Sequence, residues 1–149
     1  MGAALRWVSI GLFLLVCAFF IAFGVLYASV EDLLWFHAAA VPSLALSDIR
    51  PLYFALMKLI GGAAIALGLL GSYVVLGPIR KGQTIAAAAL SVAFSVPLLM
   101  AAYVAETLAA TTGAPTAWHN MGVLLAVTAS AWAAHTLSHR RNPKVAHHG

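Results

Sequence analysis

Charged side chains are scarce in this chain. Of its 149 residues, Lys and Arg account for 8 and Asp and Glu for 4, so that 8% of the sequence is charged. Soluble domains average about 25% charged residues, and a chain with so few cannot cover a water-facing surface. Hydrophobic residues make up 63% of the sequence, which favours burial in a lipid bilayer. The composition therefore excludes a soluble globular domain.

Cysteine and catalytic motifs are also scarce. The single cysteine, Cys17, cannot form an internal disulfide, so the sequence does not identify a redox compartment. There is no glycine-rich phosphate loop, no serine nucleophile elbow and no cysteine pair that could hold a metal. The sequence therefore assigns neither a reaction nor a cofactor.

What the chain does contain is long apolar stretches. A membrane-spanning helix needs about 20 predominantly apolar residues, and four stretches meet this requirement, at 7–28, 51–77, 84–110 and 116–137. Residues 138–149 form a polar, basic tail. We predict an all-α integral membrane protein with a single domain over residues 1–149, built as an up-down-up-down bundle of four transmembrane helices. Pro51 is expected to open the second span, because proline suits a first helical turn.

A fifth apolar segment, residues 33–40, is too short to cross a bilayer. Its aromatic residues favour a short helix lying in the outer membrane interface, within the first outer loop. Ser29 and Asp32 precede it at the spacing of a capping box, which predicts a helix start at Ser29.

The few charges are segregated along the chain. Basic residues cluster at both ends and between the second and third spans: Arg6, Arg80, Lys81, Arg140, Arg141 and Lys144. The acids fall in the alternate loops and span ends: Glu31, Asp32, Asp48 and Glu106. Because short cytoplasmic loops carry an excess of Lys and Arg, both termini are predicted to be cytoplasmic, in a bacterial inner membrane. The net charge of +4 then suits an anionic inner leaflet, and the expected partner is the lipid bilayer, with no nucleic acid.

Two charged residues fall inside the predicted spans. Lys58 lies roughly 10 Å into the second span and Glu106 roughly 6 Å from the outer end of the third. Lys58 shares a helix face with Gly61, Gly62 and Ile65 in the small-residue stretch 61–68, and this face should pack inward on another helix. Intramembrane charges normally face the bundle and find a partner. We expect an inward Lys58–Glu106 pair; the alternative is that Lys58 snorkels to the outer headgroups.

Three more polar residues are predicted at the same outer level. His37 lies in the interfacial segment, and His119 and Asn120 begin the fourth span. Two imidazoles and the Glu106 carboxylate are an acceptable ligand set for zinc or non-haem iron, and a haem between His37 and His119 also remains open. No two of these residues share a helix at metal-ligand spacing, so the alternative is interfacial histidines bonded to backbone or water. The metal and the cofactor stay unknown.

Three functions remain open. The first is an accessory or assembly component that packs against a membrane protein partner or forms a homo-oligomer, in keeping with small-residue faces and little extramembrane mass. The second is a binding protein or enzyme for a lipid- or quinone-like ligand, using the outer-face residues Lys58, Glu106, His37, His119 and Asn120. The third is a proton-coupled small transporter using Lys58 and Glu106, although no further charge continues a path inward. We rank the accessory or assembly component first.

Overall fold

The structure, a computed structural model, describes residues 2–41, 46–116 and 118–140, and these form helices and no strands. Three long helices and a four-residue one precede the last: α1 (Gly2–Ala28), α2 (Trp35–Ala38), α3 (Leu46–Val74) and α4 (Thr84–Thr112). A short π-helix, η2 (Val75–Ile79), continues α3, and α5 (His119–Arg140) completes the described chain. The all-helical prediction is confirmed for these residues.

Four of the helical segments are long and apolar enough to cross a membrane: Gly2–Ala28, Ser47–Ile79, Thr84–Thr112 and His119–Arg140. They indicate a multi-pass membrane protein, as the composition predicted. The predicted tail starts too early: residues 138–140 belong to the last helix, where Ser138 is buried. The rest of the predicted tail lies outside the described residues.

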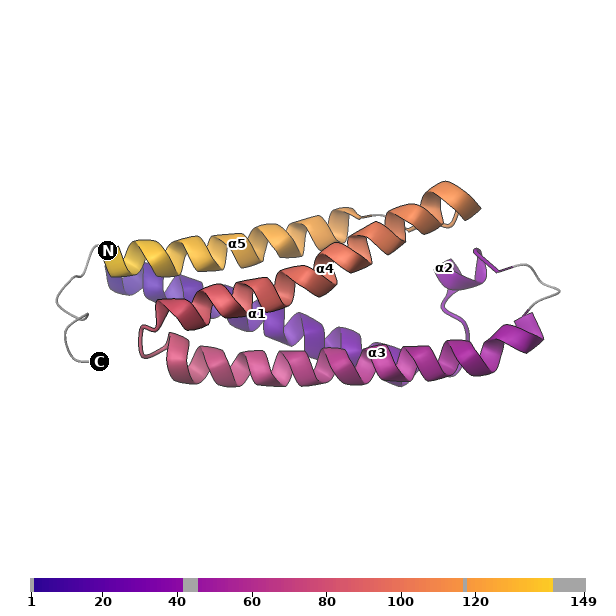
Figure 1. The fold of residues 1–149 in the computed structure, drawn as a ribbon, viewed down its shortest axis with the longest axis horizontal. Helices are drawn as coiled ribbons and strands as arrows, with labels where there is room; N and C mark the ends of the chain where they lie inside the picture. The colour runs from indigo at the N-terminus through magenta and orange to yellow at the C-terminus, as the bar shows by residue number, and fades with distance from the viewer. Residues whose placement is uncertain (1, 42–45, 117, 141–149) are drawn as a thin grey trace.

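The ends of the helices gather at two ends of the molecule (Figure 1). At one end lie the start of α1, the turn between η2 and α4, and the end of α5; the Arg6 guanidinium donates a hydrogen bond there to the backbone carbonyl of Arg80. We call this the basic end, because it carries Arg6, Arg80, Lys81 and Arg140. The opposite end, with α2 and the start of α3, is called the α2 end.

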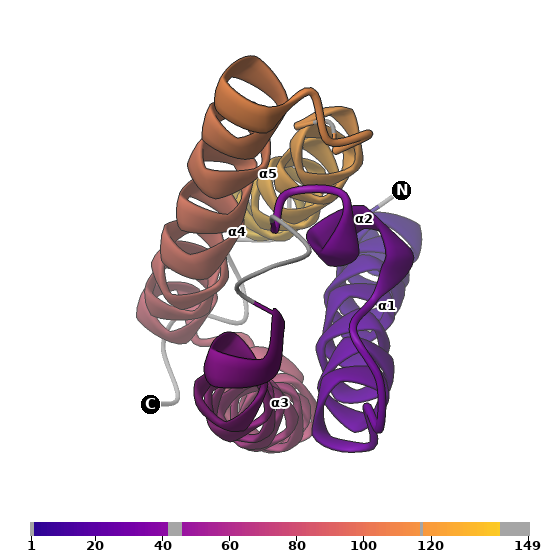
Figure 2. The same cartoon turned by 90° about the vertical axis from the view of Figure 1, so that its right-hand side faces the viewer.

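Helix α1 is the centre of the packing. It lies between α3 and α5, whereas α4 packs along α5 and makes few contacts with α3 (Figure 2). Buried residues on α1 and α3 recur at alternating spacings of three and four, the pattern of left-handed helix packing. On α1 this stripe is Ile10, Phe13, Cys17, Phe20 and Gly24; on α3 it is Met57, Gly61, Ala64, Gly68 and Gly71, and it continues to Val75 at the start of η2.

Glycine allows α1 and α3 to approach closely. A Cβ added to Gly61 would lie 2.6 Å from the Ala28 nitrogen and 2.6 Å from the Gly24 oxygen. A Cβ on Gly68 would lie 2.6 Å from an Ile21 side-chain carbon and 2.8 Å from the Cys17 oxygen. Backbones this close gain van der Waals contact that larger residues would prevent. The close packing predicted for the small-residue stretch 61–68 is therefore present at Gly61 and Gly68.

Stacked aromatic rings provide another contact between the helices. The Phe20 and Phe94 rings stack with centroids 5.2 Å apart, joining α1 to α4 in the middle of the molecule. Gly71 makes room for this pair, since a Cβ there would lie 2.6 Å from Phe94 Cζ. Phe13 and Phe94 are both fully buried. Together with Ala131 of α5, these residues form a core that all four long helices share.

Prolines set the limits of α3 differently from the prediction. The helix begins at Leu46, so Pro51 lies inside it and does not open it. At the other end the helix continues through Pro78 as η2, in which the Arg80 amide donates to the Val75 carbonyl at 3.0 Å. Because Pro78 has no N–H to donate four residues back, the turn widens instead of ending.

The capping box predicted at Ser29 is wrong. The Ser29 amide donates to the Val25 carbonyl at 3.0 Å, so Ser29 closes the end of α1. The Asp32 carboxylate accepts the Leu33 amide at 2.8 Å and pairs with the Arg50 guanidinium at 3.0 Å. The Asp32 carboxylate thus has its partners without capping a helix. Helix α2 starts later and is only the four residues Trp35–Ala38.

We predict that Gly61→Ala lowers the free energy of unfolding by about 1–3 kcal/mol, the usual cost of overpacking. Gly62→Ala is the matched control, because nothing lies within 4 Å of a Cβ at Gly62. On helix propensity alone, Gly62→Ala should raise the free energy of unfolding by up to about 1 kcal/mol. Denaturation of both variants in a mild detergent measures the difference, and equal effects would contradict the close approach.

Candidate functional site

His37 docks α2 onto α3 through Tyr53. The Tyr53 hydroxyl accepts the Leu34 amide at 3.2 Å and lies 2.9 Å from His37 Nδ1. Because the hydroxyl can both donate and accept, it pairs with either tautomer of a neutral His37 imidazole while it accepts the Leu34 amide. The Tyr27 ring meets the His37 ring edge-on, with centroids 6.2 Å apart. The sequence analysis missed Tyr53, whose position two residues after Pro51 gave no signal.

Burial lowers the pKa of the His37 imidazole below its ordinary value of 6.5, because partial removal from water disfavours the charged ring. His37 is half-buried among aromatic rings, including Phe36 at a centroid distance of 4.4 Å. Its environment is that of a neutral docking residue.

The expected inward Lys58–Glu106 pair is wrong. Both side chains are exposed, and in the described part of the chain the only ion pair within 4.0 Å is Arg50–Asp32. Met57 and Gly61 occupy the inward stripe of α3, and Lys58 is turned about 100° from Met57 on the helix. Helices α3 and α4 also make few contacts with each other, so their charges are held apart.

His119 and Asn120 are exposed at the start of α5. The His119 ring stacks on Trp118, with centroids 4.5 Å apart and an interplanar angle of 22°. Across residues 2–41, 46–116 and 118–140, no three His, Cys, Asp or Glu side chains are grouped so that they could hold a metal ion. The predicted set of His37, Glu106 and His119 is therefore not assembled within the chain.

A second polar cluster lies at the basic end, inside the bundle. His135 is fully buried, and the His135 and His139 rings lie one turn apart on α5 with centroids 4.9 Å apart. No described residue offers a hydrogen-bond partner to either ring nitrogen of His135 or to Nε2 of His139. The cause of the burial is the packing stripe of α5, which runs through Thr128, Ala131, His135 and Ser138.

The other buried polar groups on this interface are satisfied. Ser9 donates to the Ala131 carbonyl at 2.7 Å, which ties α1 to α5, and Thr128 donates to the Leu124 carbonyl at 2.8 Å. Ser138 donates to the His135 carbonyl at 2.7 Å. The two histidines are thus the exception. The sequence analysis missed them as a pair, although their spacing of four residues on one helix was a visible signal.

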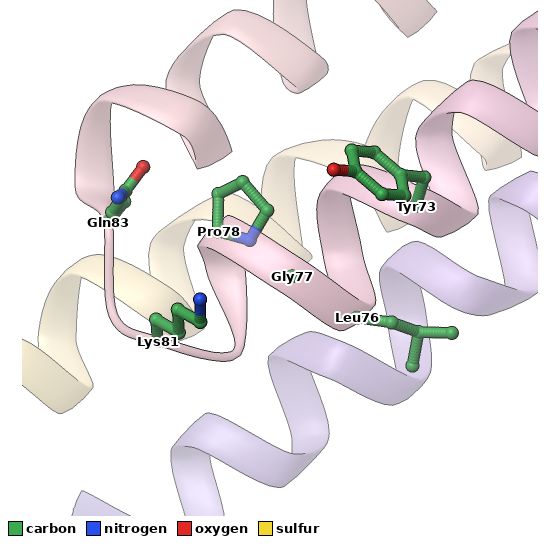
Figure 3. Close-up of a pocket in the computed structure, with 6 residues that line it drawn as sticks. All are labelled: Tyr73, Leu76, Gly77, Pro78, Lys81 and Gln83. Carbon is green, nitrogen blue, oxygen red and sulfur yellow. The ribbon is translucent and has the colours of Figure 1, made fainter.

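Two pockets open at the basic end. One, of about 400 Å³, lies over the end of α3 and the following turn, with Tyr73, Pro78, Lys81 and Gln83 around it (Figure 3). The other, of about 280 Å³, lies between the start of α1, the turn before α4 and the end of α5. It is lined by the first turn of α1 and by Arg6, Trp7, Arg80, Ser138 and His139.

Fold and polar groups together define a multi-pass helical membrane protein with separate polar regions at its two ends. Comparisons with protein-family models, with curated proteins and with solved structures find no match. Function therefore has to be inferred from the arrangement of the side chains.

We predict that His135→Leu raises the free energy of unfolding by about 1 kcal/mol, because leucine removes buried nitrogens that have no protein partner. Thr128→Val is the control: it removes a buried hydroxyl that is hydrogen-bonded, and should be neutral or lower stability by up to about 1 kcal/mol. Chemical denaturation in neutral detergent measures both. A loss of stability in His135→Leu would mean that the imidazole makes a stabilising contact.

Acidification should weaken the docking of α2. Because the pKa of His37 in the folded protein lies below 6.5, the unfolded chain takes up the proton first as pH falls. The stability contributed by the neutral ring is complete above pH 6.5, declines below it, and levels off once pH passes the folded pKa. Unfolding measured across this range should show a steeper loss for the wild type than for His37→Gln. Parallel curves for the two proteins would argue against a buried neutral His37.

Proposed function

We propose that this protein is an accessory or assembly subunit of a membrane complex, and that α3 and α4 form the face that receives another membrane protein. The observation that carries the proposal is the placement of Lys58 and Glu106. Both are exposed, and they lie on the pair of neighbouring helices that contact each other least.

The position of these charges makes them costly in a bilayer. Lys58 lies eight residues past Arg50, roughly 12 Å along the helix, and Glu106 lies six residues before the end of α4, roughly 9 Å. A charge at the centre of a spanning helix costs about 2.5–3.5 kcal/mol on insertion scales. Neither side chain has an ion-pair partner among the described residues. A partner helix that supplies a carboxylate to Lys58 and a cation to Glu106 would remove this cost.

The small extramembrane mass also supports an accessory role. The described residues are almost entirely helical, with short connections, and leave little chain for a domain outside the membrane. Exposed apolar side chains also lie on α3 and α4, among them Leu59, Leu69, Met100 and Val104. A surface of this composition can pack against lipid or against the helices of another membrane protein, and the second arrangement would pair both charges.

The proposed orientation is an up-down-up-down bundle with both termini in the cytoplasm of a bacterium and α2 in the outer interface of the inner membrane. Arg6, Arg80, Lys81 and Arg140 lie at one end of the molecule. Lys and Arg mark the cytoplasmic side of a membrane protein, so this end is placed inside. Trp35, which is exposed on α2, suits the headgroup level on the opposite side.

The test is isolation of the tagged chain from its own membrane under gentle conditions, followed by native mass spectrometry. We expect a stoichiometric membrane protein partner with the wild type. Lys58→Ala or Glu106→Ala should lower the yield of the complex at least about tenfold. This factor corresponds to the loss of one charge pair that contributes about 1.4 kcal/mol to binding. Val25→Ala, at an exposed position on α1 outside the proposed face, is the control and should keep the partner.

Folding of the isolated chain separates the two explanations of a lost complex. Since neither charge is paired within residues 2–41, 46–116 and 118–140, Lys58→Ala and Glu106→Ala should melt at the wild-type temperature. A bare monomer from the native membrane would contradict the proposal. A second copy as the only partner would replace the accessory role with a homo-oligomer, in which Lys58 of each copy can meet Glu106 of the other by two-fold symmetry.

A further inference from the structure

The pocket of about 280 Å³ at the basic end is lined by positively charged side chains and by no negatively charged ones. The positively charged side chains are those of Arg6 and Arg80. All the acids of the chain lie elsewhere, in the segment before α2, at the start of α3 and near the end of α4: Glu31, Asp32, Asp48 and Glu106. The positive potential of the pocket is therefore not neutralised by any carboxylate of the protein.

The pocket also presents hydrogen-bond donors in several directions. A guanidinium has five N–H donors, and Arg6 commits one side of its fork to the Arg80 carbonyl, which fixes the group and leaves other donors available. The first turn of α1 lines the pocket, and the first N–H groups of a helix have no partner within the helix. A tetrahedral anion with several acceptor oxygens, such as a phosphate, matches fixed donors of this kind.

His139 forms the inner wall of the pocket and is held in place on two sides. Its ring packs against the fully buried His135 ring on one side. On the other side it lies against Gly82, where a Cβ would come within 2.7 Å of Cε1. Gly82 has φ +95°, a conformation that suits glycine. His139, which lines the pocket, thus carries a buried Nε2 that has no hydrogen-bond partner among the described residues.

The surroundings of the pocket favour a lipid as the source of the phosphate. Trp7 lines the opening and is 63% exposed, the position that an indole ring takes at the headgroup level. Beyond it, Val8 and Leu15 continue an exposed apolar surface along α1 on which acyl chains can lie. The pocket volume of about 280 Å³ lies just below the roughly 300–1,000 Å³ of small-molecule sites, so the pocket fits a headgroup and not a whole lipid.

We propose that this pocket binds the phosphate group of an anionic phospholipid, with Arg6 and Arg80 as the charged ligands and His139 and Ser138 as the polar wall. The site is distinct from the α3–α4 face, and neither proposal depends on the other. Basic pockets between membrane helices on the cytoplasmic side are a recurrent means of holding anionic headgroups.

The test is native mass spectrometry of the full chain in neutral detergent, titrated with phosphatidylglycerol or phosphatidylcholine. We expect one phosphatidylglycerol per chain, bound about tenfold or more tightly than phosphatidylcholine. Arg80→Gln keeps the backbone carbonyl that Arg6 uses and should weaken phosphatidylglycerol about fivefold, which corresponds to about 1 kcal/mol per basic residue near an anionic surface. Lys81→Gln is the matched control, since Lys81 is adjacent in sequence but lines the other pocket.

Three outcomes would overturn the proposal. Equal affinity for the two lipids would remove the role of charge, and equal losses in Arg80→Gln and Lys81→Gln would mean attraction by net charge without a site. Displacement of phosphatidylglycerol by excess inorganic phosphate would make free phosphate the ligand.

Arg6→Gln should also weaken binding of phosphatidylglycerol about fivefold. Because this substitution removes the bond to the Arg80 carbonyl, the melting temperature of the variant must be compared with that of the wild type. If it fails to fold, Arg80→Gln still decides the question.

Discussion

Where α1 meets α3, glycine takes the place of a side chain at Gly24, Gly61 and Gly68, and the two backbones lie closer than any Cβ would allow. This contact determines the positions of the other helices. With one face of α1 used by α3, the remaining buried positions of α1 pack on α5, where Ser9 donates to the Ala131 carbonyl. Helix α4 then has α5 as its main neighbour, and α3 and α4 are left with few mutual contacts. One close helix pair thus produces a bundle that is not closed around its circumference.

The same stripe geometry explains which polar residues are buried. On α3 the alternation of three and four residues passes through Met57 and Gly61, and therefore turns Lys58 outward. On α5 the alternation passes through His135, and therefore turns an imidazole inward. Polarity alone would have predicted the reverse, because a charge in a spanning segment is expected to face the bundle. The packing of small residues outweighs that preference here, and the charge is left at the surface of the bundle.

From the sequence, the extent of the helices and the segregation of charge could be predicted, because both depend on composition over long windows. The helical phase at Lys58 could not, since a stretch as rich in Gly and Ala as residues 61–68 offers several faces of nearly equal size. Ser29 and Asp32 matched a capping box, but the Arg50 guanidinium, eighteen residues away from Asp32, takes up its carboxylate. The metal set of His37, Glu106 and His119 was wrong for a related reason. It required side chains from α2, α4 and α5 to meet at one point, and the described residues do not bring them together. The His135 and His139 pair was readable from spacing, yet its burial depends on tertiary packing.

Apart from the hydrogen bond of Arg6 to the Arg80 carbonyl, charged side chains contribute little to holding the described part of the fold together. The one ion pair among the described residues, Arg50–Asp32, is exposed and lies in the segment around α2, where screening by water makes such pairs worth about 0–1 kcal/mol. The core relies instead on glycine contacts, stacked Phe20 and Phe94 rings and a few hydroxyls bonded to backbone carbonyls. Lys58 and Glu106 on one face, and Arg6 and Arg80 at the basic end, are left to interact with other molecules. Intramembrane charges carry a solvation cost that the contacts of this fold do not offset at Lys58 and Glu106. The protein partner that we propose at the α3–α4 face would offset it, and the anionic headgroup that we propose at the basic end would pair with Arg6 and Arg80.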